Sequence, residues 1–120
     1  MTHATPEAVI QRQLDAYNAR DLDAWLATYA ADAKQYEFPA TLLTDGHDQI
    51  RARSAPRFQE PDLHAKLLSR SVMGDIVIDH EEVTRNFPEG RGTIGLVCIY
   101  RVRDGLIREA SFVFGEKKLG

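Results

Sequence analysis

Two residues of this chain, Glu37 and His80, have side chains suited to acid-base chemistry. Glu37 stands between Tyr36 and Phe38 in an otherwise apolar run that is typical of a strand. A carboxyl group buried among apolar side chains has a raised pKa and can act as a general base near neutral pH. The alternative is that Glu37 lies on the exposed face of an edge strand. We predict Glu37 as the catalytic base, with this alternative open.

His80 lies in an acidic stretch of the chain. If Ile76 and Ile78 face the core, the two-residue period of a strand also turns His80 inward. A buried histidine beside an acid can relay a proton near neutral pH, and we predict this catalytic role for His80. The alternatives are a hydrogen-bonded core histidine and a surface histidine. Glu37, His80 and Glu82 would also make a two-acid, one-histidine metal set, but nothing in their spacing requires it, so no metal is predicted.

Other side chains are candidates for holding a substrate. Gln13 and Tyr17 are one helical turn apart, and both can donate a hydrogen bond to a developing oxyanion. The aromatic candidates Trp25 and Phe112 and the thiol of Cys98 can also be interpreted simply as core residues. Cys98 has no basic neighbour that would activate its thiol. The predicted substrate-binding residues are Gln13, Tyr17, Trp25, Phe38, Cys98 and Phe112.

Helices must position the first of these residues. Residues 5–7 (TPE) are a helix start, and apolar residues then recur at helical spacing as far as Tyr17. Asp21 can cap a second helix, whose apolar stripe extends from Leu22 to Tyr29.

A third helix is expected from about residue 48 to residue 55, where Pro56 would end it. Arg51, Arg53 and Arg57 make this segment polar. It therefore suits the rim of a pocket better than the core.

The second half of the chain predicts a sheet. A short strand at residues 34–38 precedes a loop at residues 40–46, and Asp104-Gly105 is a strong hairpin signal. Helices gathered on one face of an antiparallel sheet form an α+β fold. The four later strands are rich in β-branched and aromatic residues, and they are predicted at residues 65–73, 75–85, 93–103 and 106–115.

Composition excludes several classes of function. The 120 residues suit one hydrophobic core, with 43% hydrophobic and 28% charged residues, an ordinary globular balance. The net charge is −3 and Lys and Arg do not cluster, so no nucleic-acid partner is expected. A single cysteine gives no sign of an oxidising compartment, and no apolar run is long enough for a bilayer. We therefore expect a cytoplasmic protein with no membrane partner.

Five stretches of the chain match a known pattern: residues 18–24 (NARDLDA), 29–33 (YAADA), 37–39 (EFP), 46–51 (GHDQIR) and 114–118 (FGEKK). Together they resemble the ketosteroid isomerases and their NTF2-like relatives. Two further stretches, residues 78–81 (IDHE) and 100–107 (YRVRDGLI), are more similar to the SnoaL-like polyketide cyclase branch. The resemblance implies that residues 1–120 form a single domain, cone-like, with about three helices on the concave face of a strongly curved antiparallel sheet. It also implies an apolar cavity and a homodimer.

The catalytic parts of the ketosteroid isomerases carry over incompletely. In that family a helix tyrosine and a protonated aspartate stabilise an enolate that a strand carboxylate forms. The tyrosine position falls here on Gln13 and the aspartate position near Cys98. The base falls on Glu37, or on Phe38 if Pro39 anchors the match. With two of three parts altered, steroid isomerisation by the familial mechanism is not expected.

The sequence therefore supports a small-molecule pocket, with three interpretations. The first is a cofactor-independent enzyme that isomerises, cyclises or dehydrates a small apolar carbonyl compound by proton abstraction. The second is a non-catalytic ligand-binding module of the same fold. The third is an interaction protein with a collapsed cavity. A homodimer through the outer face of the sheet is compatible with all three.

Overall fold

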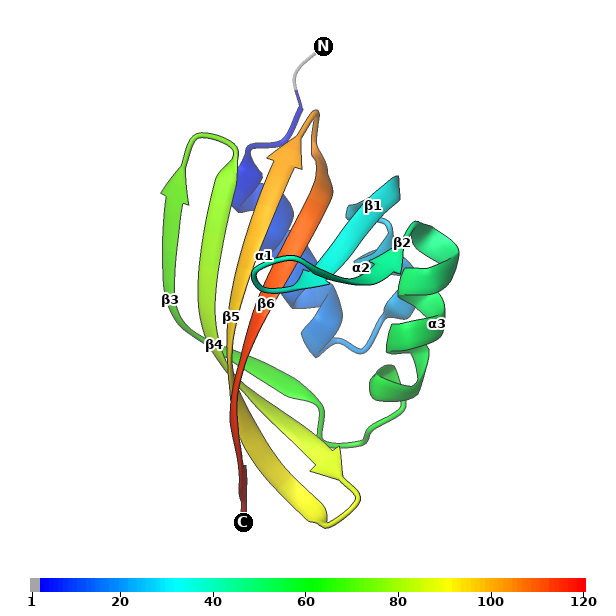
Figure 1. Ribbon diagram of the computed structural model, residues 1–120, viewed down its shortest axis with the longest axis vertical. Helices are drawn as coiled ribbons and strands as arrows, with labels where there is room; N and C mark the ends of the chain where they lie inside the picture. The colour runs from blue at the N-terminus through cyan, green and yellow to red at the C-terminus, as the bar shows by residue number, and fades with distance from the viewer. Residues whose placement is uncertain (1–2) are drawn as a thin grey trace.

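The computed structural model describes residues 3–120 and contains both helices and strands (Figure 1). Three helices and two strands make up the first half, and four longer strands follow in sequence. In chain order these are α1 (Pro6–Asn18), α2 (Leu22–Leu26), β1 (Tyr29–Glu37), β2 (Thr41–Asp45), α3 (His47–Phe58), β3 (His64–Met73), β4 (Ile76–Phe87), β5 (Gly90–Arg103) and β6 (Leu106–Leu119).

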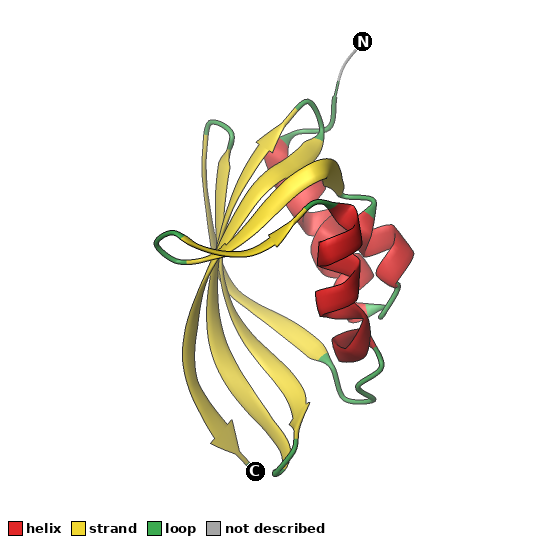
Figure 2. Ribbon diagram, turned by 45° about the vertical axis from the view of Figure 1, so that its right-hand side comes forward, coloured by secondary structure: helices red, strands yellow, loops and turns green. Residues whose placement is uncertain are grey.

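The strands form one curved, unclosed six-stranded sheet in the order β2-β1-β6-β5-β4-β3. Figure 2 shows that all the helices lie on its concave face, and that the distal ends of the later strands extend past them. The predicted α+β fold, with about three helices on a curved sheet, is thereby confirmed. One detail differs, because β1 pairs with β6 in parallel, so the sheet is mixed and not wholly antiparallel.

Local sequence explains where the first elements begin. The Thr5 hydroxyl accepts a hydrogen bond from the Ala8 amide at 3.2 Å, and Pro6 follows at the first helical position. Asp21 caps α2 in the same way, accepting from the Ala24 amide at 3.1 Å. The turn at Asp104-Gly105 has φ values of 54° and 76°, the left-handed pair that a two-residue hairpin turn requires.

The second helix is shorter than predicted. Tyr29 was expected on its apolar stripe but begins β1, where it is paired with Ile107 of β6. The Thr28 carbonyl already accepts from the Ile107 amide at 2.9 Å. Pairing with β6 therefore places Tyr29 in a strand, although the local apolar spacing predicts a helix at this residue.

Two further boundaries differ from the prediction. Residues 40–46 were expected to be a loop, but Thr41–Asp45 forms β2 and pairs antiparallel with β1. Pro56 was expected to end the third helix but lies inside α3, which continues to Phe58. The buried Phe58 ring packs against Tyr17 and Trp25, at centroid distances of 5.3 and 5.2 Å. This contact offsets the helical hydrogen bond that a proline removes.

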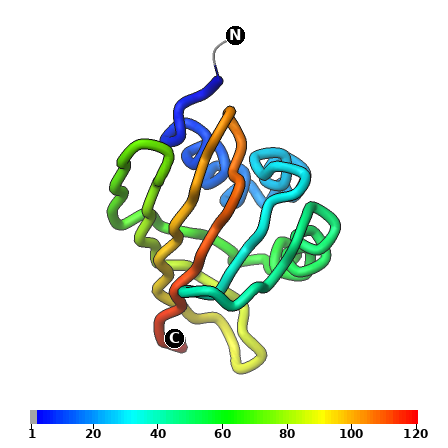
Figure 3. The backbone as a smooth tube through the Cα atoms, turned by 45° about the horizontal axis from the view of Figure 1, so that its top comes forward, coloured from blue at the N-terminus to red at the C-terminus, as the bar shows by residue number. Residues whose placement is uncertain are grey.

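The core lies between the helices and the concave face. The backbone trace in Figure 3 shows α1 crossing behind β5 and β6, with α3 beside β1 and β2. The sheet and the helices thus enclose a space whose walls come from almost every element of the chain.

Within residues 3–120 no helix has the length and hydropathy needed to cross a membrane.

Candidate functional site

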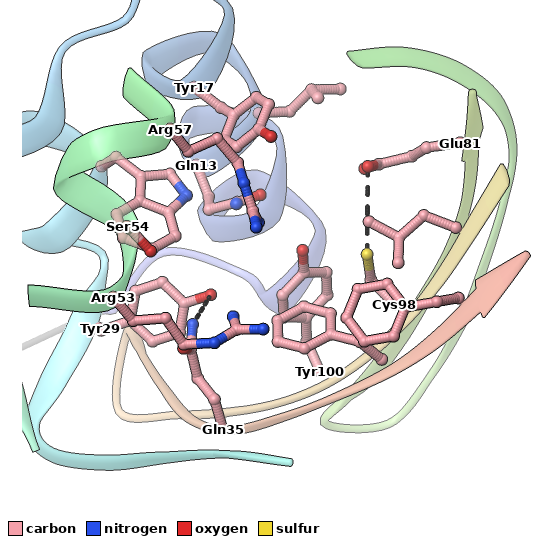
Figure 4. Close-up of a pocket in the computed structure, with 15 residues that line it drawn as sticks. Gln13, Tyr17, Tyr29, Gln35, Arg53, Ser54, Arg57, Glu81, Cys98 and Tyr100 are labelled. Carbon is pink, nitrogen blue, oxygen red and sulfur yellow. Dashed lines mark hydrogen bonds between the residues drawn. The ribbon is translucent and has the colours of Figure 1, made fainter. Parts of the chain in front are cut away.

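A cavity of about 50 Å³ lies between α1, α3 and the concave face of the sheet (Figure 4). A single water needs roughly 10–15 Å³ by the same kind of measure, so the space is larger than one water requires. Its walls combine aromatic rings with amide, hydroxyl, guanidinium, carboxyl and thiol groups. The lining residues are Gln13, Leu14, Tyr17, Trp25, Tyr29, Gln35, Arg53, Ser54, Arg57, Glu81, Leu96, Cys98, Tyr100, Phe112 and Phe114.

Glu81 supplies the carboxyl group of the cavity. It lies on β4 and is 4% exposed. Burial, reinforced by the charge of Asp79 and opposed by that of Arg70, raises the pKa of Glu81 to about 7. The Cys98 thiol on neighbouring β5 lies 4.0 Å from Glu81 Oε1 as its donor. Glu81 is therefore a carboxyl group that can hold or release a proton near neutral pH.

The neighbouring acid, Asp79, is fully buried but has a partner. Arg70 of β3 binds both its oxygens, with Nε to Oδ1 at 2.7 Å and a terminal nitrogen to Oδ2 at 2.9 Å. A second terminal nitrogen of Arg70 donates to Gln11 of α1 at 2.9 Å. This pair fixes the charge that acts on Glu81 and links three elements.

Two arginines of α3, Arg53 and Arg57, extend their guanidinium groups into the cavity, on the side away from Glu81 (Figure 4). Burial, followed by the charge of Arg85, lowers the pKa of Arg57 from its ordinary value. Neither Arg53 nor Arg57 forms a salt bridge with a carboxylate of the described residues. The helical wall of the cavity is consequently cationic.

Three buried side-chain atoms have no hydrogen-bond partner within residues 3–120, and all three belong to the lining. They are Gln13 Oε1, Trp25 Nε1 and Arg57 Nε. Buried polar atoms in native proteins are nearly always paired, because an unpaired one costs about 1–3 kcal/mol. Their concentration around one cavity marks it as a place where polar groups are held ready for a partner.

Other polar groups of the lining already have hydrogen-bond partners. Gln35 donates to the Tyr29 hydroxyl at 3.3 Å and accepts from the Thr44 hydroxyl at 3.0 Å. Burial raises the pKa of Tyr29 above its ordinary range and that of Tyr17 to about 12. Both phenols therefore stay protonated and can act as donors but not as bases at neutral pH.

The structure brings together most of the predicted binding residues. Gln13, Tyr17, Trp25, Cys98 and Phe112 all line the cavity. Phe38 does not, because it follows the last residue of β1 and is 54% exposed. Phe38, predicted from the sequence to bind substrate, therefore lies outside the cavity.

The two predicted acid-base residues lie outside the cavity. Glu37 is exposed at the end of β1. His80 is exposed because β4 alternates in the opposite sense to the one assumed, with Asp79 and Glu81 inward and Ile78 outward. The inward orientation predicted for His80 is wrong. The set of Glu37, His80 and Glu82 does not assemble either, and residues 3–120 contain no cluster of three His, Cys, Asp or Glu side chains suited to a metal.

Sequence reasoning missed Glu81 as a candidate and placed the α3 arginines only at a rim. One signal for Glu81 was present, since Val77, Asp79, Glu81 and Val83 alternate with the outward residues, and valines favour the buried face of a sheet. The partner that makes an inward Asp79 tolerable, Arg70, belongs to a different strand.

Comparison with known proteins agrees with this architecture. A family model described as SnoaL-like domain matches residues 10–110. The chain belongs to the SnoaL-like domain family. No protein of curated function matches this SnoaL-like chain.

Solved structures share the fold of this SnoaL-like domain. An uncharacterised cystatin-fold protein from Novosphingobium aromaticivorans is 22% identical, with a TM-score of 0.83 over 92% of this chain and 98% of that one. A putative SnoaL-like polyketide cyclase from Jannaschia sp. CCS1 is 20% identical, with a TM-score of 0.76 over 91% and 84%. A hypothetical protein with a ketosteroid isomerase-like fold from Catenulispora acidiphila is 17% identical, with a TM-score of 0.73 over 93% and 88%. At these identities the likeness establishes the fold alone.

Proposed function

We propose that this SnoaL-like domain binds a small carbonyl compound in its cavity and moves a proton on it, with Glu81 as the acid-base group. The observation that carries the proposal is the placement of Glu81, a buried carboxyl group with a pKa of about 7 that faces hydrogen-bond donors across the cavity. The reaction class is isomerisation, cyclisation or dehydration, and this chemistry requires no cofactor.

The proton balance of such a step is simple. The ionised Glu81 carboxylate takes a proton from the carbon next to the carbonyl, and the carbonyl oxygen gains the negative charge of an enolate. The neutral Glu81 carboxyl then returns the proton to a different carbon in an isomerisation, or to a hydroxyl group that leaves as water in a dehydration. In a cyclisation the enolate carbon attacks a second carbonyl of the same molecule, and the alkoxide formed there takes the proton. A group whose pKa lies near the working pH is well suited to both halves of this exchange.

Donors for the enolate oxygen are available on the opposite walls. Trp25 Nε1 is buried without a partner, and the Tyr17 hydroxyl also lines the cavity. Preorganised donors in a dry site stabilise a developing oxyanion more strongly than water does. Gln13, predicted as a donor from the sequence, keeps that proposed role, whereas the exposed Glu37 and His80 do not enter this mechanism.

Solvent exchange tests the proposal directly. We would incubate the full chain with a panel of small ketones in deuterated water and follow carbon-bound deuterium by NMR. The matched variants are Glu81→Gln and Glu82→Gln, since Glu82 is the exposed neighbour on the opposite face of β4. Loss of a general base lowers the rate about 10²–10⁴-fold, so Glu81→Gln should remove exchange and Glu82→Gln should retain it. Equal exchange in the wild type and Glu81→Gln would refute the assignment.

A non-catalytic ligand-binding module remains the second candidate. It is favoured by the unpartnered Gln13, Trp25 and Arg57 atoms, which would serve a bound ligand without any proton transfer. The same exchange experiment separates the two functions. A module would bind ketones from the panel in the wild type and in Glu81→Gln, and neither protein would exchange their protons.

The homodimer is also a proposal, supported by apolar residues on the convex face. Ile78 of β4 pairs with Ile99 of β5, and Val97 of β5 pairs with Val113 of β6. Ile78 and Val113 are 38% and 41% exposed, so apolar side chains are accessible on this face. Light scattering should give twice the monomer mass for the wild type, and Ile78→Asp should shift it toward the monomer. A monomeric wild type would exclude the dimer.

A further inference from the structure

The charges around the cavity do not balance. Two guanidinium groups, from Arg53 and Arg57, project into it from α3 (Figure 4). Among the described lining residues the one acid is Glu81, and it lies on the far wall on β4. When Glu81 is protonated the cavity carries only positive charge.

Other partly buried arginines of the molecule are paired with carboxylates. Arg70 binds Asp79 through two nitrogens, and Arg85 binds Glu60 in the same manner at 2.9 and 2.8 Å. Arg57 lacks such a partner among the described residues, and its Nε is buried without an acceptor. A buried cation without a counter-charge is strongly unfavourable. Arg57 is also near the like charge of Arg85, which adds to that cost.

We propose that Arg57 and Arg53 bind the carboxylate of the ligand, so that the substrate is a small carboxylic acid with an apolar body. This inference rests on the proposed function, in which the cavity binds a small carbonyl compound, and it adds the chemical class of that compound. A guanidinium group presents a planar fork of donors that matches the two oxygens of a carboxylate.

The remaining walls suit the rest of such a molecule. Trp25 Nε1 is a further unpartnered donor of the lining, and the rings of Trp25 and Phe112 with the Leu96 side chain provide an apolar surface. A carboxylate on the α3 side would leave the opposite end of a small ligand directed toward Glu81. The reacting carbon and the recognised anion would thus occupy opposite ends of the cavity.

The single tryptophan of the chain, Trp25, reports on this site because it lines the cavity. We would titrate the full chain with matched pairs of probes, benzoate against benzamide and 4-oxopentanoate against its methyl ester, and follow Trp25 fluorescence and its indole N–H resonance. Inorganic phosphate serves as a third anion. Because a charge-assisted bidentate pair is much stronger than a neutral contact, each acid should bind at least about 10-fold more tightly than its neutral partner.

Variants of α3 assign the binding to the proposed arginines. Arg57→Gln and, separately, Arg53→Gln should weaken benzoate binding by about 10-fold or more, with unchanged benzamide binding. Arg51→Gln is the matched control, because Arg51 lies on the same helix, exposed and paired with Asp23 at 2.8 Å. Circular dichroism verifies that each variant is folded. If Arg57→Gln does not fold, the binding result for Arg53→Gln tests the inference.

Each outcome has a definite meaning. Tighter binding of the acids that is lost in the arginine variants supports the inference. Equal binding of acids and neutral partners, tighter binding of phosphate than of both acids, insensitivity to Arg57→Gln and Arg53→Gln, or no response of Trp25 to any acid overturns it. Proton exchange on neutral ketones without a preference for acids would leave the proposed function intact and refute only the carboxylate site. Binding of the acids without any proton exchange would support the carboxylate site and refute the proposed acid-base function.

Discussion

Asp79 and Glu81 lie two residues apart on the concave face of β4, and Arg70 binds Asp79 alone of the two. Asp79 is fully buried and Glu81 is 4% exposed. The pairing leaves Glu81 next to a like charge in a buried site, and burial together with that charge raises its pKa to about 7. The salt bridge of one acid therefore helps to set the proton affinity of the other.

The free energy of unfolding should fall as the pH rises through the titration of Glu81. Its folded pKa of about 7 lies above the ordinary 4.5, so the folded state holds this proton more tightly than the unfolded state. The stabilisation is complete below pH 4.5 and disappears as the pH rises past about 7. At about 1.4 kcal/mol per pKa unit the loss is on the order of 3 kcal/mol. Urea unfolding across this pH range measures it.

Glu81→Gln should remove this pH dependence, because an amide does not titrate. The control is Glu82→Gln, whose exposed side chain on the other face of β4 should leave the wild-type pH profile unchanged. If Glu81→Gln keeps the full slope of the wild type, the raised pKa of Glu81 is wrong.

Breaking the Arg70–Asp79 pair should destabilise the fold severely. The Arg70 and Asp79 side chains are 10% and 0% exposed, so Arg70→Gln would leave a buried carboxylate without its counter-charge. Loss of one partner of a buried pair costs about 3–5 kcal/mol. Arg101→Gln is the matched control, because its pair with Glu109 is 50% and 45% exposed and an exposed pair contributes only about 0–1 kcal/mol. Similar losses in urea denaturation for the two variants would contradict the buried role of Arg70.

Binding of benzoate should tighten as the pH falls from about 8 to about 6, if the α3 arginines hold its carboxylate. Protonation of Glu81 removes the only negative charge among the described lining residues. The groups that act on Glu81 are Asp79 on its own strand, Arg70 on β3 and the Cys98 thiol on β5, while Tyr17 and Arg57 lie across the cavity. Burial keeps the thiol and the phenol protonated, since it raises the pKa of both.

Trp25 fluorescence titrations of benzoate at several pH values measure this effect. The affinity should change several-fold for the wild type, and Glu81→Gln should bind benzoate at the higher pH as tightly as the wild type does at the lower pH. Benzamide is the neutral control and should show no such trend. A pH dependence that persists in Glu81→Gln would mean that another group titrates in the cavity.

Most of the fold could be predicted because its signals are local. Caps at Thr5 and Asp21, helical spacing in α1 and the Asp104-Gly105 turn each depend on a few adjacent residues. The errors occurred where distant pairing decides the structure. Tyr29 belongs to β1 because it pairs with β6. Thr41–Asp45 forms β2 because it pairs with β1.

The site was predictable only in part for the same reason. Gln13 and Tyr17 follow from the stripe of a helix, whereas the facing of β4 depends on a partner elsewhere in the sheet. Hydrophobicity alone favours an inward Ile78, but the salt bridge to Arg70 allows Asp79 to be buried instead, and the alternation of β4 is the reverse of the one assumed. His80 is thereby turned to the convex face and Glu81 to the cavity.

Two glycines of β5 should respond oppositely to alanine substitution. A Cβ at Gly92 would lie 2.4 Å from the Lys118 carbonyl oxygen of β6, which is backbone and cannot turn aside. A Cβ at Gly95 would meet nothing within 4 Å. Gly92→Ala should therefore destabilise the fold by about 1–3 kcal/mol through overpacking. Gly95→Ala should be neutral or stabilise by up to about 1 kcal/mol, because alanine loses less backbone entropy.

Urea denaturation of the two variants measures their free energies of unfolding and so tests the steric effect expected at Gly92 and the entropic effect expected at Gly95. Gly92 pairs with Leu119 at the distal end of β5 and β6, and neither residue lines the cavity. Gly92→Ala should consequently lower the stability without weakening the binding of benzoate at a temperature where the variant is folded. Equal stability of the two variants would show that β6 moves away from β5 at no cost. A loss of benzoate affinity in folded Gly92→Ala would show that the distal end of the sheet and the cavity are coupled.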